Sequence, residues 1–332
     1  MKIAAVACFS NELAIASAFR DQLETFFDKS YLISHNSYDK TEEIFLNLER
    51  FSVTKVRDKV FRQAELVRDG MVKAFSEGAD WVVFLDFDEF LPFDNRILFE
   101  KFLIGHSTKD VIFWNWVNIF PEKLGSTDLF AQPFVTLNNA QTLTKIIVAK
   151  SAYQKDPNLL LTHGSHSLIS NQKIEEYREK NFKLIHIPIH GLEHFKQKVM
   201  QREVTEGDSA FFREFMETYI AKGSFNLDLL REVALNYCGD RNFRSKQIIF
   251  DFNFPYVKSK YLAEKESAID SLFAIIYNML STHGDTHTNR IEREVYLEEL
   301  SAKEIIESRS WKITRPLRAA NSALKKFKSL KI

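Results

Sequence analysis

The chain has 332 residues, of which 45% are hydrophobic and 27% charged, a composition typical of a folded globular protein. Its 45 basic and 45 acidic residues give a formal net charge of zero, which argues against nucleic acid as a partner. Two cysteines cannot form a disulfide framework and suit a reducing compartment. No window approaches the roughly 18 apolar residues of a membrane span, so we expect a cytoplasmic protein that is at most peripherally bound to a membrane.

The first ninety residues alternate strand and helix patterns. Continuous apolar runs predict strands at 2–8 and 81–85, and two further short strands are expected at 30–35 and 51–56. Apolar residues at spacings of three and four predict helices at 11–26, 41–49 and 56–75. Strand–helix repetition predicts a parallel sheet with helices on both faces, and such sheets bind ligands beyond the carboxyl ends of their strands.

Three acids, Asp86, Asp88 and Glu89, directly follow the apolar strand at 81–85. Because strand side chains alternate, Asp86 and Asp88 are expected on the same side. Two adjacent carboxylates repel unless a cation joins them, and Mg²⁺ or Mn²⁺ accepts carboxylate oxygens. The pattern favours a metal site, and two solvated acids at a strand end are the alternative.

Residues 78–91 resemble the "gaDWvvflDxDEFl" segment of bacterial family 2-like glycosyltransferases with a GT-A fold. Asn11-Glu12 and residues 36–41 are similar to the "NE" and "N-S-x-D-x-T" motifs after the first and second strands of that family. Residues 186–198 resemble its "H-x-P-x-R … qf … K" segment, with His190 in place of Arg. Residues 310–318 resemble the "SWriTaPLR" tail of enzymes that build surface polysaccharides.

This resemblance implies an α/β fold of the GT-A (Rossmann-like) type, a mixed, mainly parallel sheet flanked by helices. It implies a metal-dependent glycosyltransferase of bacterial surface polysaccharide synthesis. Such an enzyme transfers a sugar from a nucleotide-sugar donor, with a UDP-sugar expected, to a glycan or lipid-linked acceptor, and the resemblance favours inversion. The expected nucleotide-binding residues are Ala7, Asn11, Glu12, Asp39, Lys145 and Asp86, with a surface lysine as the alternative for Lys145.

The expected Mn²⁺ or Mg²⁺ ligands are Asp86 and Asp88, and the resemblance adds His166 and His186 as candidates for a third ligand. A Cys/His set at zinc spacing is absent, so no zinc site is predicted. Alternation along 184–190 places His186 and His190 on the polar side of a half-buried strand.

The general base that takes the proton of the acceptor hydroxyl is expected among Glu206, Asp208 and His194, with Asp208 preferred. A solvated residue beside Gly207 is the alternative for Asp208. Trp114 and Trp116 share one face of a strand at 111–120, where they either stack on a sugar or belong to the core.

Three domains are predicted: a catalytic domain at 1–200, a mainly helical extension on the acceptor side at 201–308, and a basic amphipathic tail at 309–332. Helical patterns lie at 211–219, 227–237 and 267–280, and a strand or loop is expected at 248–256. The tail carries eight basic residues and no acid, which leaves a formal charge of −8 on residues 1–308. Such a segment suits an anionic membrane surface, a solvated terminal helix or a partner subunit.

Two other functions remain open. A catalytically silent relative would bind glycan or scaffold a membrane assembly. A phosphohydrolase of the haloacid dehalogenase type also uses D-x-D after a strand, but it places the motif at the first strand and has Thr or Val where this chain has Phe90.

Overall fold

The computed structural model describes residues 1–37, 39–57, 62–124, 129–138, 143–192, 194–195, 198, 227–235 and 246–261. The larger helices are α1 (Leu13–Phe26), α2 (Gln63–Ser76), α3 (Arg96–Gly105), α4 (Lys150–Lys155) and α7 (Leu227–Leu235). Short 3₁₀ turns are η1 (Thr41–Ile44), η2 (Leu129–Ala131) and η3 (His163–Ser165). The N-terminal strands are β1 (Ile3–Phe9), β2 (Lys29–His35), β3 (Phe51–Val56), β4 (Trp81–Asp86) and β5 (Glu89–Phe90). The later strands are β6 (Val111–Pro121), β7 (Phe134–Leu137), β8 (Thr144–Ala149), β9 (Leu160–Leu161), β10 (Leu168–Ile169), β11 (Glu176–Arg178), β12 (Leu184–His186) and β13 (Gln247–Phe250).

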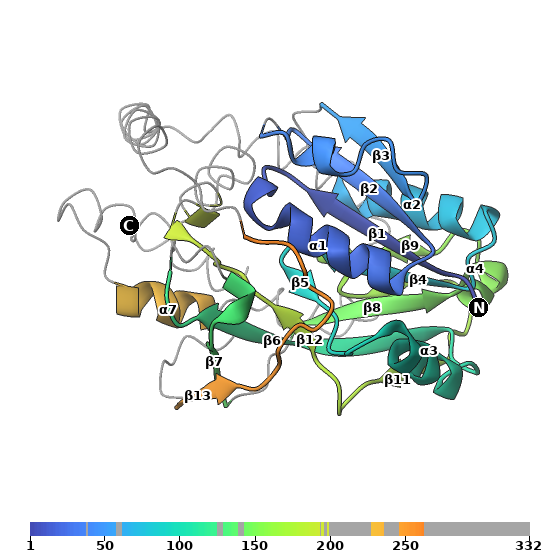
Figure 1. The fold of residues 1–332 in the computed structure, drawn as a ribbon. Coiled ribbons are helices and arrows are strands. Elements are labelled where there is room, and N and C mark those ends of the chain that lie inside the picture. The colour runs from blue at the N-terminus through green and yellow to red at the C-terminus, as the bar shows by residue number, and fades with distance from the viewer. Residues whose placement is uncertain are drawn as a thin grey trace, which may run out of the picture. The chain divides into compact units, whose positions relative to one another are not determined.

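The fold is α/β, with a mixed, mainly parallel sheet flanked by helices, as expected (Figure 1). The main path of the sheet runs β13-β7-β6-β8-β4-β1-β2-β3. Strands β1 to β4 are mutually parallel, whereas β8 runs antiparallel between β4 and β6. The carboxyl ends of β1, β2 and β4 therefore meet at one edge, where an α/β sheet binds its ligands.

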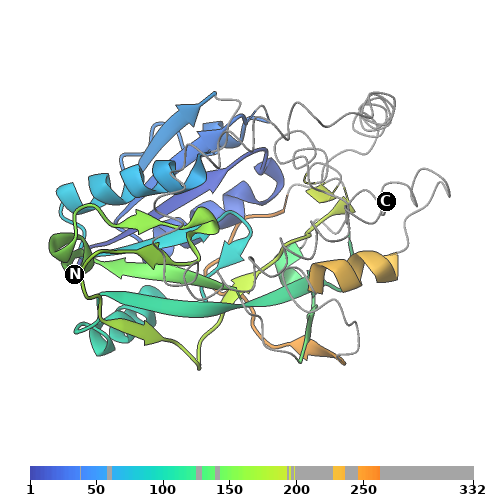
Figure 2. The same ribbon diagram turned by 180° about the vertical axis from the view of Figure 1, so that it is seen from behind.

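Helices cover both faces of the sheet, and the alternation of β1 shows why. Ile3, Ala5 and Ala7 pack with α1 and α3 in one apolar cluster. The alternate residues of β1, such as Val6, pack with α2 in a second cluster. Figure 2 shows α2 on the face opposite α1. A strand buried on both faces must be apolar throughout, which explains the continuous apolar run.

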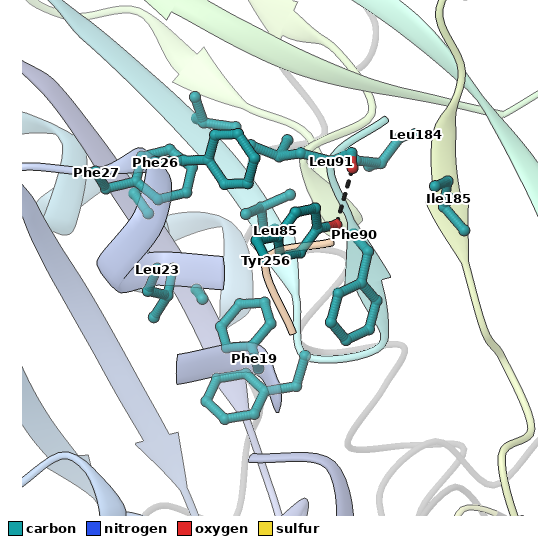
Figure 3. Packing of buried hydrophobic residues seen from close by; sticks show 14 of the residues in the cluster. Phe19, Leu23, Phe26, Phe27, Leu85, Phe90, Leu91, Leu184, Ile185 and Tyr256 are labelled. Carbon is teal, nitrogen blue, oxygen red and sulfur yellow. Dashed lines mark hydrogen bonds between the residues drawn. The ribbon is translucent and has the colours of Figure 1, made fainter. Parts of the chain in front are cut away.

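The abundant phenylalanines form the core on the α1 side (Figure 3). Phe26 meets the ring of Tyr256 edge-on at 4.9 Å, and the Tyr256 hydroxyl donates a hydrogen bond to the Leu91 carbonyl at 2.8 Å. The Asp21 carboxylate accepts hydrogen bonds from the backbone of Lys258 and Ser259 at 2.6 Å. Residues 246–261 thus pack on the same core as the N-terminal sheet.

Three predicted elements differ from the structure. The helix expected at 41–49 is only the turn η1, because Thr41 and Glu42 bond to neighbouring loops and strands instead of starting a helix. The helix expected from residue 56 begins at Gln63, because β3 extends to Val56. The strand expected at 184–190 ends at His186, and every residue of that stretch is buried.

The predicted strands at 2–8, 30–35, 51–56 and 81–85 and the helices at 11–26 and 227–237 correspond to described elements. The helices expected at 211–219 and 267–280 and the tail at 309–332 lie outside the described residues. Within the described part of the chain, no helix has the length and apolar character needed to cross a bilayer.

Candidate functional site

The loops at the carboxyl ends of β1 and β2 are held in unusual backbone conformations. Asn11, Asn36 and Lys40 have positive φ angles of 56°, 50° and 69°. Asn accepts this left-handed region more readily than most residues. Several such residues at one sheet edge are typical of a functional site, because the surrounding structure must maintain the strain.

Asp39 joins these two loops. One carboxylate oxygen accepts a hydrogen bond from the Leu13 backbone at the start of α1 at 2.8 Å, and the other accepts from the Thr41 hydroxyl at 2.6 Å. The Ser37 hydroxyl donates to Asp39 at 3.0 Å and accepts from the Asn11 backbone at 3.0 Å. Asp39, expected at the nucleotide, thus has both oxygens engaged in shaping the loop that carries Asn11 and Glu12.

Lys145 pairs with the acids after β4. Its Nζ lies 2.7 Å from Asp86 Oδ2 and 3.4 Å from Glu89 Oε1. The Glu89 carboxyl also accepts a hydrogen bond from the Asp86 backbone at 2.8 Å. The Lys145 side chain is 1% exposed, so it is no surface lysine, whereas that of Asp86 is 34% exposed. Asp86 is therefore the member of this group that can reach a ligand.

Asp88 has a second set of partners. Lys198 forms an ion pair with Asp88 and donates a hydrogen bond to the Pro188 carbonyl at 3.0 Å. His186 Nε2 lies 3.5 Å from Asp88 Oδ2, and His186 Nδ1 lies 2.8 Å from the side-chain oxygen of Asn118. Buried carboxylates are stable only when paired, and Asp88 is 4% exposed.

The protonation of this edge follows from burial and charge. Burial opposes the ionisation of Asp88, but Lys198 and His186 outweigh it and hold the pKa of Asp88 well below its usual range. Burial raises the pKa of Glu89 well above its usual range, and Asp86 and Asp88 add to this effect against Lys145. Burial lowers the pKa of His186 despite the nearby Asp88. Glu89 thus holds its proton more tightly than an exposed glutamate does.

Trp116 packs against both predicted histidine ligands. The centre of its ring lies 4.3 Å from that of His186 and 5.3 Å from that of His166. Trp114, by contrast, stacks near Phe99 and Phe102 with no exposed surface, so it belongs to the core.

His166 is held by backbone contacts beside Trp116. Its Nδ1 lies 2.7 Å from the Thr144 carbonyl, and burial lowers the pKa of His166. Gly164 has φ +72°, and a Cβ at that position would lie 2.4 Å from His166 Nε2. Only glycine therefore fits next to the His166 ring in this arrangement.

Glu12, His190 and His194 form a third cluster at this edge. The Glu12 Oε2 atom lies 3.7 Å from His190 Nε2 and 3.6 Å from His194 Nε2. The two imidazoles are stacked with their centres 3.6 Å apart. Burial opposes the ionisation of Glu12, but His194 and His190 outweigh it and lower the pKa of Glu12 to about 2.

In this arrangement Asp86 and Asp88 each pair with a lysine ammonium through one carboxylate oxygen. Among the described residues, the one group with three ligand atoms within 4.8 Å of one another is Glu12, His190 and His194. The four expected ligands, Asp86, Asp88, His166 and His186, are neighbours around Trp116 and the lysines without forming such a group.

The other expected residues take different places. Ala7 lies within β1, where its side chain is fully buried in the core. Asn11 donates its backbone N–H to Ser37 beside Glu12. Glu206 and Asp208, the expected bases, lie outside the described residues, and His194 lies in the cluster with Glu12.

Sequence reasoning gave no partner to Glu89 and no role to Lys198. It also treated His190 as a departure from a family pattern. One available signal was the closeness of His190 and His194, which lie four residues apart directly after the last predicted strand of the catalytic domain.

No protein-family model matches the chain, and no curated protein matches it. Solved structures that resemble it include S. aureus TarS 1–349, with 14% identity, a TM-score of 0.37, and 73% of this chain and 72% of that chain covered. The complex of that protein with UDP-GlcNAc has 12% identity and a TM-score of 0.35, with 73% of each chain covered. A putative nucleotide-diphospho-sugar transferase from Desulfovibrio desulfuricans has 13% identity and a TM-score of 0.33, covering 72% of this chain and 100% of that chain. Such low identities and scores do not establish a shared family.

Proposed function

We propose that the chain is a glycosyltransferase of the GT-A type that transfers a sugar from a nucleotide-sugar donor, a UDP-sugar, to an acceptor hydroxyl. The observation that carries this proposal is the charged group at the carboxyl ends of β1 and β4. There, Lys145 and Lys198 pair with Asp86 and Asp88, and only Asp86 keeps a third of its side chain exposed.

A structural role alone does not explain this group. Burying paired charges costs about as much as the pairing returns, and apolar side chains of similar size often stabilise a fold equally well. Open α/β sheets bind ligands at the edge where the group lies. Charged residues with shifted pKa values at a ligand-binding edge favour a functional role.

In the proposed reaction, the bond between the anomeric carbon and the phosphate oxygen breaks, and the acceptor oxygen bonds to that carbon. The acceptor proton passes to a general base, for which Asp208, Glu206 and His194 are the candidates. The resemblance to family 2 favours inversion. Lys198, the more exposed of the two lysines, adds positive charge near the departing diphosphate. The exposed Asp86 carboxylate accepts hydrogen bonds from hydroxyls of the donor.

The acceptor is proposed to be a glycan or lipid-linked intermediate of bacterial surface polysaccharide synthesis. The eight basic residues of 309–332 support a peripheral contact with the anionic cytoplasmic face of a membrane, where a lipid-linked acceptor would lie.

A thermal-shift screen of UDP-sugars and other nucleotide sugars tests donor binding, because a ligand that binds only the folded state raises the melting temperature. Asp86→Asn should weaken donor binding by at least about tenfold, since it removes a charge-assisted hydrogen bond. Asp80→Asn is the matched control. Asp80 lies exposed at the opposite end of β4, so this variant should bind the donor as the unchanged chain does.

Equal binding by Asp86→Asn and the unchanged chain would refute the placement of the donor at Asp86. Binding of no nucleotide sugar at all would refute the proposed function. Binding without release of nucleoside diphosphate would indicate the catalytically silent relative.

A further inference from the structure

Glu12, His190 and His194 come together although they are far apart in the sequence. Glu12 ends the loop after β1 and precedes α1, whereas His190 and His194 follow β12. One ligand atom from each residue lies within 4.8 Å of the other two. The two histidines are 1% and 4% exposed, so the cluster is shielded from water.

The atoms that face one another are not satisfied by hydrogen bonds. Glu12 Oε2, His190 Nε2 and both ring nitrogens of His194 are buried without a hydrogen-bond partner. Buried polar atoms are nearly always paired, so several unpaired atoms that converge on one point indicate a missing ion or water. The mix of one carboxylate oxygen with imidazole nitrogens favours an ion.

The spacing agrees with a shared ion. The distances of 3.7 Å and 3.6 Å from Glu12 Oε2 to the two imidazole nitrogens are too long for hydrogen bonds. Two ligands bound at about 2.1 Å to one tetrahedral ion lie about 3.4 Å apart. Coordination would require the two imidazoles to turn out of their stacked arrangement, so that both ring nitrogens point at the ion, together with a small inward movement.

The surroundings hold these side chains in place. His190 Nδ1 lies 3.0 Å from the Tyr261 hydroxyl, and metal-binding histidines commonly use their second nitrogen in this way. A Cβ on Gly191 would lie 2.7 Å from the Tyr261 oxygen, so the glycine lets the tyrosine approach. The Glu12 backbone N–H donates to the Thr41 hydroxyl at 3.0 Å.

Protonation of both histidines explains the cluster less well. Two stacked imidazolium rings 3.6 Å apart would repel each other. The nearby Lys198 is already paired with Asp88.

We propose that Glu12, His190 and His194 bind a divalent transition-metal cation, with Zn²⁺ the best match to two imidazoles and one carboxylate. Three protein ligands leave one position open for a ligand, as in catalytic zinc sites. This site is separate from the Mg²⁺ or Mn²⁺ site expected at Asp86 and Asp88, and it assigns a zinc-type site where sequence spacing predicted none. A role of the bound cation in holding a donor phosphate or an acceptor oxygen rests on the proposed function.

Metal binding is tested on the full chain after removal of metal with a chelator. Calorimetric titration with Zn²⁺ should show one equivalent bound, and Co²⁺ should give the visible absorption of a four-coordinate site. Mg²⁺ should bind far more weakly, because it prefers oxygen ligands. His194→Ala and the isosteric Glu12→Gln should each weaken Zn²⁺ binding by at least about tenfold. Asp86→Asn should bind Zn²⁺ like the unchanged chain.

Circular dichroism shows whether each variant is folded, and Glu12→Gln covers the case in which His194→Ala does not fold. Absence of stoichiometric Zn²⁺ binding by the unchanged chain would overturn the proposal. Zn²⁺ binding that survives in Glu12→Gln but is lost in Asp86→Asn would overturn it as well. Donor turnover by the metal-free chain would support the proposed function alone, and Zn²⁺ binding without turnover would support the metal site alone.

Discussion

Lys145 supplies the positive charge that pairs with Asp86 and Glu89, and its side chain is buried between them. Lys145→Met should destabilise the fold by about 3 kcal/mol, since removing one partner leaves a carboxylate in a poorly solvated place. Lys29→Met is the control, because Lys29 and its partner Glu77 are both more than a third exposed, and it should cost less than about 1 kcal/mol. Urea denaturation measures both values, and equal losses would contradict the role given to Lys145.

Glu89 gives the site a pH dependence of known sign. Its pKa in the folded state lies above the value of about 4.3 of an unfolded glutamate, so the folded state loses stability as the pH rises from that value through the folded pKa. Glu89→Gln has no proton to lose. The melting temperature of Glu89→Gln minus that of the unchanged chain should therefore increase from pH 5 to pH 8. If this difference stayed constant over that range, Glu89 would ionise normally.

The residue types of the site were largely predictable, but their pairing was not. Asp86, Asp88, His186 and Lys145 follow from local motifs. Asp86 pairs with Lys145, which lies 59 residues away in the sequence. Asp88 pairs with Lys198, which lies 110 residues away. Local patterns contain no information on such distant contacts, so the lysine partners of the two aspartates were not predicted.

At the scale of elements, the turn η3 positions His166 beside Trp116. Gly164→Ala should destabilise the fold by about 1–3 kcal/mol, because alanine is strained at φ +72° and its Cβ would collide with the His166 ring. Gly105→Ala is the control, since a Cβ there meets nothing within 4 Å and should stabilise α3 by about 0.4–1 kcal/mol. Thermal unfolding distinguishes the two, and a neutral Gly164→Ala would show that η3 relaxes without cost.

The N-terminal strands were the most predictable elements. β1 and β4, which are buried on both faces, were predicted to within one residue at each end, and the partly exposed β3 matches the expected 51–56 at both ends. The helix predicted at 41–49 failed because tertiary contacts decided the conformation. Glu42 pairs with Lys55 and Arg57 on and after β3 instead of continuing a helix. The strand predicted at 184–190 ends already at His186. Its alternating pattern suggested one polar side, but both sides are buried.

At the scale of the whole molecule, the formal net charge of zero combines −8 on residues 1–308 with +8 on 309–332. Deletion of 318–332 should weaken binding to vesicles that contain anionic lipid, because each basic residue near such a surface contributes up to about 1 kcal/mol. Sedimentation with anionic and neutral vesicles measures this binding. Unchanged binding to anionic vesicles after the deletion would refute membrane contact through the tail.

The central claim concerns the chemistry at the carboxyl ends of β1 and β4, and release of nucleoside diphosphate from UDP-sugars tests it most directly. The full chain should release UDP from at least one UDP-sugar, faster when a suitable acceptor is present. Asp86→Asn should lose most of that activity, and Asp80→Asn should keep it. Turnover that is equal in Asp86→Asn and the unchanged chain would contradict the account.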